Sequence, residues 1–182
     1  MKENVMSIIN DDNRFNFDIA YMVYTTVYSN WAFLSDKERK KARRQVEGTV
    51  REAGFNGNPT GLISKSALET VVNQKKGIKP TKETRTAIEH PITYTNIAMH
   101  CLTKEERLSF EDYFRVWFDN LITTITTNEE NYALKRYQNK FTFGVDDWRE
   151  MYAAAGIKLV LDIESRRIDM LQKAGLLENK EL

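Results

Sequence analysis

Apolar side chains recur at three- and four-residue steps through the first fifty residues, which is the spacing of one face of an α-helix. The stripe runs from Phe17 to Trp31. A capping-box spacing follows, with Ser35 at the cap position and Glu38 three residues later. The pattern predicts helices over about residues 4–53.

The middle of the chain changes period twice. The turn-rich segment GFNGNPTGL predicts a break, and a short helix is expected over residues 64–73. From Thr84 the helical period is lost, and TRTAIE predicts a short strand that ends near Glu89, ahead of Pro91. One more helical turn is expected over residues 96–101.

The remaining pattern alternates between helix and strand. Thr103 and Glu106 have capping-box spacing and predict a helix over residues 103–120, whose aromatic face belongs to the core. LITTITT is almost entirely β-branched and predicts a second strand, followed by a helix over residues 127–140. The expected fold is therefore α+β, mostly helical, with a small two-stranded centre.

Composition places the chain among ordinary globular proteins. It has 182 residues, of which 41% are hydrophobic and 29% charged, and a single cysteine, Cys101. A lone thiol, the lack of a signal-like N-terminus and the lack of a long apolar run predict a cytoplasmic protein without a membrane partner. The formal net charge is only +1, so a nucleic-acid partner would have to bind local clusters of basic residues.

Candidate chemistry centres on the dipeptide Glu89-His90. An imidazole accepts a proton near neutral pH, and a divalent cation neutralises charge on a departing oxygen. Glu89 and an oxygen ligand from the helix start at residues 128–131 would hold such a cation if the strand bends before Pro91. Strand, strand and helix with polar residues at both junctions predict a ββα-type metal site for phosphodiester hydrolysis.

The segment AIEHPI resembles the acid-histidine region of HNH endonucleases, and ITTITTNEENYALKRYQ resembles their closing strand and metal-bearing helix. With the later G-I-x-L, the stretch from Thr84 to Val160 also looks like uncharacterised phage proteins described as HNH-like or free-standing homing endonucleases. The resemblance implies His90 as general base and Glu89 and Asn131 as ligands of Mg²⁺, or Mn²⁺. It also implies a double-stranded DNA substrate, the host cytoplasm as location and a monomer.

We expect three regions, namely a helical region 1–80 that is a candidate for DNA binding, a nuclease core 81–160 and a C-terminal helix 161–182. The resemblance itself covers about residues 84–160 and leaves the first eighty residues unexplained. It leaves open which asparagine completes the motif, with Asn96, Asn120 and Asn128 as candidates. Basic residues on two predicted helices are the candidates for phosphate contact. They are Lys40, Lys41, Arg43, Arg44, Lys135 and Arg136.

Simpler interpretations compete with each assignment. His90 can be a surface histidine beside a turn proline, and the acids at 129 and 130 are ordinary helix-start residues. His100 is either a second metal ligand or part of a half-buried helical turn. As alternatives to an enzyme, the chain can be a DNA-binding regulator that reads with residues 35–53, or a phage inhibitor of a host factor, which the near-neutral charge favours.

Overall fold

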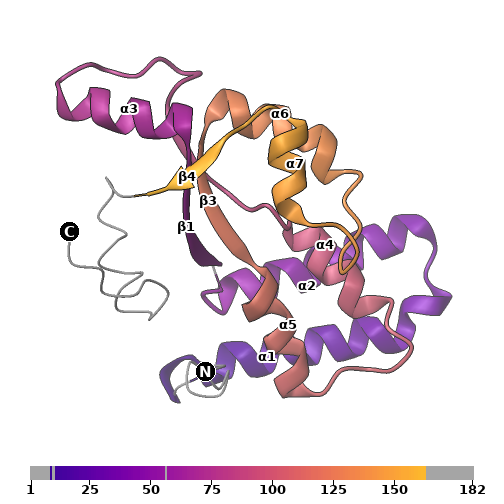
Figure 1. Cartoon of the computed structure of the whole chain (residues 1–182). Helices are drawn as coiled ribbons and strands as arrows, with labels where there is room; N and C mark the ends of the chain where they lie inside the picture. Colours follow the sequence, from indigo (N-terminus) through magenta and orange to yellow (C-terminus); the bar gives the residue numbers. More distant parts are fainter. Residues whose placement is uncertain (1–8, 10, 56, 163–182) are drawn as a thin grey trace. The chain divides into compact units, whose positions relative to one another are not determined.

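The computed structural model describes residues 9, 11–55 and 57–162, and the chain divides into two compact units. Unit 1 combines residues 1–57 with 92–121, and unit 2 combines residues 58–91 with 122–182. Both units are therefore discontinuous in sequence, and the expected core region 81–160 contributes to both. The described part of the chain is α+β and mostly helical, as the sequence predicts (Figure 1).

Every regular element in the described part of unit 1 is a helix. The predicted capping box is confirmed, because the backbone N–H of Ser35 donates to the Glu38 carboxylate over 2.9 Å. Helices are thereby confirmed for the described part of the N-terminal region. The elements of unit 1 are α1 (Asp11–Asn30), the 3-10 turn η2 (Trp31–Phe33), α2 (Asp36–Glu52), α4 (Tyr94–Leu102) and α5 (Phe110–Asn120).

The core of unit 1 is aromatic. Tyr24 of α1 stacks on Tyr113 of α5 with ring centroids 4.3 Å apart, and Phe114 and Trp117 are completely buried beside them. Large buried rings remove much apolar surface from water and add favourable edge contacts. The aromatic face predicted for α5 is therefore confirmed as part of the core.

The predicted start of that helix is wrong. Helix α5 begins at Phe110, and Ser109 is its cap, accepting from the backbone N–H of Asp112 over 3.1 Å. Thr103 instead ends α4, where its hydroxyl donates to the carbonyl of Met99. Both Thr103 and Ser109 precede an acidic residue by three positions, so spacing alone could not choose between them.

Unit 2 is built on a mixed four-stranded sheet in the order β2-β3-β1-β4. Strands β2 and β3 are the two predicted strands and pair antiparallel, while β1 pairs parallel to β3 and antiparallel to β4. The elements of unit 2 are β1 (Asn58–Ser64), α3 (Lys65–Lys75), β2 (Thr86–Glu89), β3 (Ile122–Thr127), α6 (Asn128–Gln138), α7 (Trp148–Ala154) and β4 (Leu159–Leu161).

Strand β1 corrects the prediction of a plain turn between residues 54 and 62. Its pairing with β3 shifts between Pro59 and Ile63, so the strand contains a bulge. Gly61 lies in the bulge with φ +71°, a conformation that glycine adopts easily. Pro59 and Gly61, which are typical of turns, therefore lie inside a strand, and the sequence pattern predicts a loop there instead.

Helices α6 and α7 pack on one another in unit 2 (Figure 1). A side chain of each helix forms a hydrogen bond with Glu89, so both helices reach the sheet face that carries its carboxyl group. The predicted C-terminal helix 161–182 lies outside the described residues apart from its first two positions. Of these, Leu161 is the last residue of β4 and Asp162 comes directly after it. Within the described ranges, every helix is too short or too polar to cross a bilayer.

Candidate functional site: a buried carboxyl cluster

Glu89 ends strand β2 with its side chain inside unit 2, where it is only 3% exposed. In the β2–β3 ladder it lies opposite Thr124, so both side chains project from the same face of the sheet. Ile88 projects to the other face and is 59% exposed. The strand therefore turns an acid inward and an apolar side chain outward.

Three side chains donate hydrogen bonds to the Glu89 carboxyl group. The hydroxyls of Tyr152 on α7 and Thr124 on β3 both donate to Oε2, the latter over 3.3 Å. Gln138 Nε2, in the last turn of α6, donates to Oε1 and also to the backbone carbonyl of His90 at 3.0 Å. We call Glu89, Thr124, Gln138 and Tyr152 the Glu89 cluster, which joins four elements of unit 2.

The oxygen atoms of the cluster form a closed triangle. Tyr152 Oη and Thr124 Oγ1 lie 2.6 Å apart, and both contact Oε2 of Glu89. Three such contacts need three protons, and the two hydroxyls supply only two. With the acid ionised, both hydroxyls donate to Oε2 and the contact between Tyr152 and Thr124 lacks a proton. A proton on Oε2 donates to one hydroxyl while Oε2 accepts from the other, so all three contacts become hydrogen bonds and the geometry favours the neutral acid.

Burial acts in the same direction on the acid. Desolvation raises the pKa of Glu89 from 4.5 to about 7, against the opposing effect of the hydrogen bonds from Tyr152, Thr124 and Gln138. Desolvation, and next the nearby charge of Glu89, raise the pKa of the Tyr152 phenol well above its ordinary value. Glu89 therefore exchanges its proton near neutral pH while Tyr152 stays neutral.

His90 follows β2 and is half-buried, and its backbone carbonyl accepts a hydrogen bond from Gln138. Asn131 lies on α6 seven residues before Gln138, about 10 Å away at 1.5 Å per residue. Among the described hydrogen bonds of Glu89, the amide comes from Gln138 and none comes from Asn131. The structure thus brings Glu89 to the last turn of α6, whereas the sequence argument placed it at the first.

The cluster does not fit a divalent cation in this arrangement. A coordinating carboxylate must be deprotonated and must turn oxygen lone pairs toward the ion. Both oxygens of Glu89 already accept hydrogen bonds, and its pKa is raised. In the residues that the structure describes, no three His, Cys, Asp or Glu side chains gather as an ion-binding group.

The acidic start of α6 has a structural role. Glu130 Oε2 accepts hydrogen bonds from the backbone N–H and the hydroxyl of Thr127, which completes the capping box. The same oxygen accepts from the Ser64 hydroxyl at 2.5 Å, where β1 passes into α3. Glu130 therefore links the N-termini of α3 and α6. This matches the simpler interpretation of Glu130 as an ordinary helix-start residue.

The basic candidates differ in their surroundings. On α2, Arg43 forms an ion pair with Glu47 over 2.9 Å, whereas Lys40, Lys41 and Arg44 are exposed. Exposed cations with open surroundings are the better phosphate ligands, so Arg43 is the weakest candidate of this helix.

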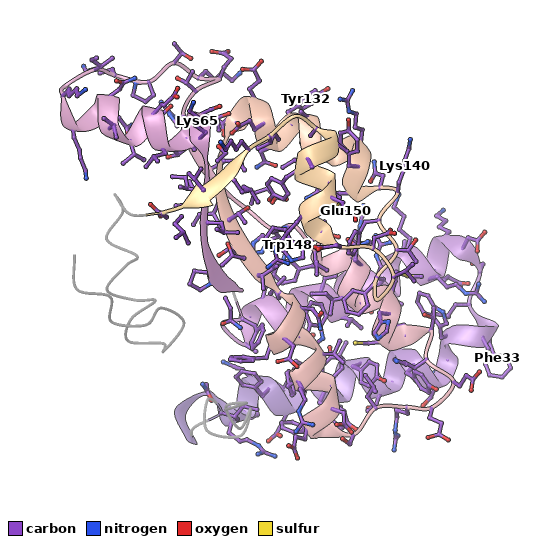
Figure 2. The ribbon with its side chains drawn as sticks, in the orientation of Figure 1. Phe33, Lys65, Tyr132, Lys140, Trp148 and Glu150 are labelled. Atoms are coloured by element: carbon purple, nitrogen blue, oxygen red, sulfur yellow. The ribbon has the colours of Figure 1, made fainter. Side chains whose placement is uncertain are left out.

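On α6, Lys135 and Arg136 are exposed and lie over the tyrosine rings of Tyr132 and Tyr137. Figure 2 shows Tyr132 on α6 and Lys140 just past its end, both projecting outward. These cations belong to unit 2, the unit that contains Glu89. The α6 residues therefore share a rigid element with Gln138 of the cluster.

A further basic segment was not singled out from the sequence. Residues 75–85, which we call the Lys75–Arg85 connection, link α3 to β2 and carry five exposed cations against one acid. Carbonyls of Lys82, Glu83 and Arg85 accept hydrogen bonds from the first residues of α6 at 2.7–3.1 Å. The charge run KKGIKPTKETR was a visible signal, but its attachment to a helix start was not.

His100 lies in unit 1, in helix α4. It borders a hollow of about 590 Å³ formed mainly by residues 103–109. Desolvation, and next the charge of Lys104, lower the pKa of His100 below its ordinary value, which favours the neutral imidazole. Its place in α4 agrees with the half-buried helical turn expected as an alternative to a metal ligand.

Comparison with known proteins gives no relatives: no family model matches this chain, and neither a curated protein nor a solved structure matches it. The resemblance to HNH endonucleases therefore stays a prediction.

Proposed function

We propose that this chain binds the phosphate backbone of double-stranded DNA along the Lys75–Arg85 connection. The observation that carries the proposal is a dense, exposed run of cations with a defined path. Five basic residues occur in eleven positions, and three backbone carbonyls of the run are bonded to the start of α6. Cations held on a fixed backbone displace counterions from a nucleic acid at a low entropic cost.

The finer proposal is an endonuclease whose reaction takes place at the end of β2, with His90 as general base. The connection runs directly into β2, and His90 follows Arg85 by five residues, about 16 Å in an extended strand. That length corresponds to about five nucleotide steps along one DNA strand. A DNA backbone bound to the connection would therefore pass the end of β2. Glu89 would hold a proton beside His90, and its arrangement supports no step through a metal ion.

Binding is tested by charge reversal. Lys79→Glu with Lys82→Glu should weaken duplex binding and lower the slope of log affinity against log salt by about two, since each lost phosphate contact removes about 0.9. The matched control is Lys40→Glu with Lys41→Glu on α2, which changes the charge equally in unit 1. Equal losses in both pairs, or none in the first, would contradict the assignment to the connection.

Hydrolysis is tested on supercoiled and linear DNA with Mg²⁺, Mn²⁺ or a chelator. Cleavage that His90→Ala abolishes while duplex binding is retained supports the endonuclease. Cleavage unaffected by His90→Ala would refute the role of His90.

A DNA-binding regulator without an active site is the second candidate. The observation that favours it is the closed Glu89 cluster, whose carboxyl oxygens already have hydrogen-bond partners. Salt-dependent binding without cleavage under any of these conditions would select it.

A further inference from the structure

An open groove runs between helices α1 and α2 of unit 1. Its volume is about 590 Å³, and its α1 side presents Met22, Val23 and Val27. Met22 is 60% exposed, so an apolar side chain of this groove faces water. Exposed apolar surface beside a groove is typical of a protein-binding surface.

The α2 side of the groove contains a glycine that the chain's own packing does not require. Gly48 lies inside α2 and has no positive φ, and an added Cβ atom would meet nothing within 4 Å. Glycine weakens a helix interior relative to alanine, and here no described neighbour needs the space. The missing side chain leaves room for another backbone to approach α2 closely.

Charges are arranged symmetrically about this glycine. Arg44 precedes Gly48 by four residues and Glu52 follows it by four, and all three line the groove. Residues four apart form one ridge on a helix surface. Arg44 and Glu52 are exposed, and no ion pair joins either of them to another described residue. Reversing the helix direction across Gly48 exchanges the positions of the cation and the carboxylate.

We propose that this groove is a self-association surface, occupied by helix α2 of a second copy that runs antiparallel and crosses at Gly48. Each Arg44 then faces Glu52 of the other copy, and the crossing covers Met22. Ridges of residues four apart pack at about −50°, and the two-fold axis makes both halves of the contact identical. Two α1–α2 hairpins form a four-helix arrangement of a common kind.

The basic end of α2 is compatible with this contact. Lys41 precedes Gly48 by seven residues, whereas the helix of the second copy ends at Glu52, only four residues from the crossing. The lysines at 37, 40 and 41 therefore lie beyond the end of the opposing helix. The inference goes beyond the proposed function, because it concerns association of the chain with itself and needs no DNA.

The test measures the dimer dissociation constant of the full chain by sedimentation velocity over a wide concentration range without DNA. The native chain should dimerise. Arg44→Glu and Glu52→Arg should each weaken the dimer by at least about tenfold, since each turns two attractive pairs into two repulsive ones. The double variant should return to nearly native affinity, and Gly48→Leu should weaken the dimer by blocking the close approach.

Lys37→Glu is the matched control, because it reverses a charge on the same helix outside the crossing and should leave the dissociation constant unchanged. A chain that stays monomeric at all concentrations overturns the proposal. A dimer that is insensitive to Arg44→Glu also overturns it, as does a double variant that fails to recover, because self-complementary charges require that recovery. Circular dichroism confirms folding of each exposed-site variant.

Discussion

Replacing Glu89 by glutamine should reverse the order of stability between acidic and alkaline pH. The amide keeps the shape of the carboxyl but cannot ionise, so it removes the one proton that the cluster exchanges near neutral pH. In the native chain the carboxyl is 3% exposed and accepts hydrogen bonds from Tyr152, Thr124 and Gln138. The variant therefore isolates the cost of charging this group inside unit 2.

The magnitude follows from the pKa of Glu89, which burial raises from 4.5 to about 7. Between these values the folded chain holds a proton that the unfolded chain has released, so the free energy of unfolding falls as pH rises. The free energy of unfolding falls by about 1.4 kcal/mol per pH unit, and by about 3 kcal/mol in total between the two pKa values. The stability that the protonated Glu89 carboxyl contributes is fully present below pH 4.5 and lost above about pH 7.

Urea unfolding near pH 5 and near pH 8 measures the effect. Glu89→Gln should be less stable than the native chain near pH 5 by about 1 kcal/mol. An amide NH₂ group in the place of Oε2 cannot accept a hydrogen bond, so one hydroxyl proton of Tyr152 or Thr124 is left without an acceptor. Near pH 8 it should be more stable by about 2 kcal/mol, since the native chain then buries a charge. Glu150→Gln on the exposed side of α7 is the control (Figure 2). Equal destabilisation at both pH values would refute a raised pKa at Glu89.

Three further outcomes follow from contacts in both units. Tyr152→Phe removes a donor to the Glu89 carboxyl, so it should cost about 1–3 kcal/mol near pH 8 and move the loss of stability to higher pH in the same urea titration. Ile88→Lys should change the unfolding free energy by less than about 1 kcal/mol, because Ile88 is 59% exposed; a several-fold larger loss would contradict its outward orientation. The Cys101 thiol is completely buried and burial raises its pKa to about 12, so a thiol reagent should modify it far more slowly in the native chain than in urea.

Local signals in the sequence were sufficient for several elements. The capping residues of α2 and α6 are set by side chains that reach only three residues along the chain, as with Thr127 and Glu130. The β-branched run of β3 and the short strand ending at Glu89 were also predicted. These features depend on propensities and on hydrogen bonds between near neighbours, which a sequence pattern contains.

Long-range pairing decided what the sequence could not predict. Strand β1 includes Pro59 and Gly61, residues typical of turns, and it becomes a strand because β3 and β4 pair with it from far along the chain. Strand β4 has only three residues and depends on the same partner. Pairing between segments about sixty to one hundred residues apart leaves no periodic mark in either segment.

The role of Glu89 shows the same limit at a single side chain. Alternation along β2 would place either Ile88 or Glu89 in the interior, and hydrophobicity favours Ile88. The sheet register instead sets Glu89 opposite Thr124, and the last turn of α6 and helix α7 bring Gln138 and Tyr152 to its oxygens. A carboxyl group enters the interior only where donors from other elements are in place to receive it. The sequence identified Glu89 as unusual because it precedes a histidine and a proline, but its partners lie 35 to 63 residues away. The chemistry of this residue therefore depends on tertiary structure, and the same acid on a slipped strand would be an ordinary surface carboxylate.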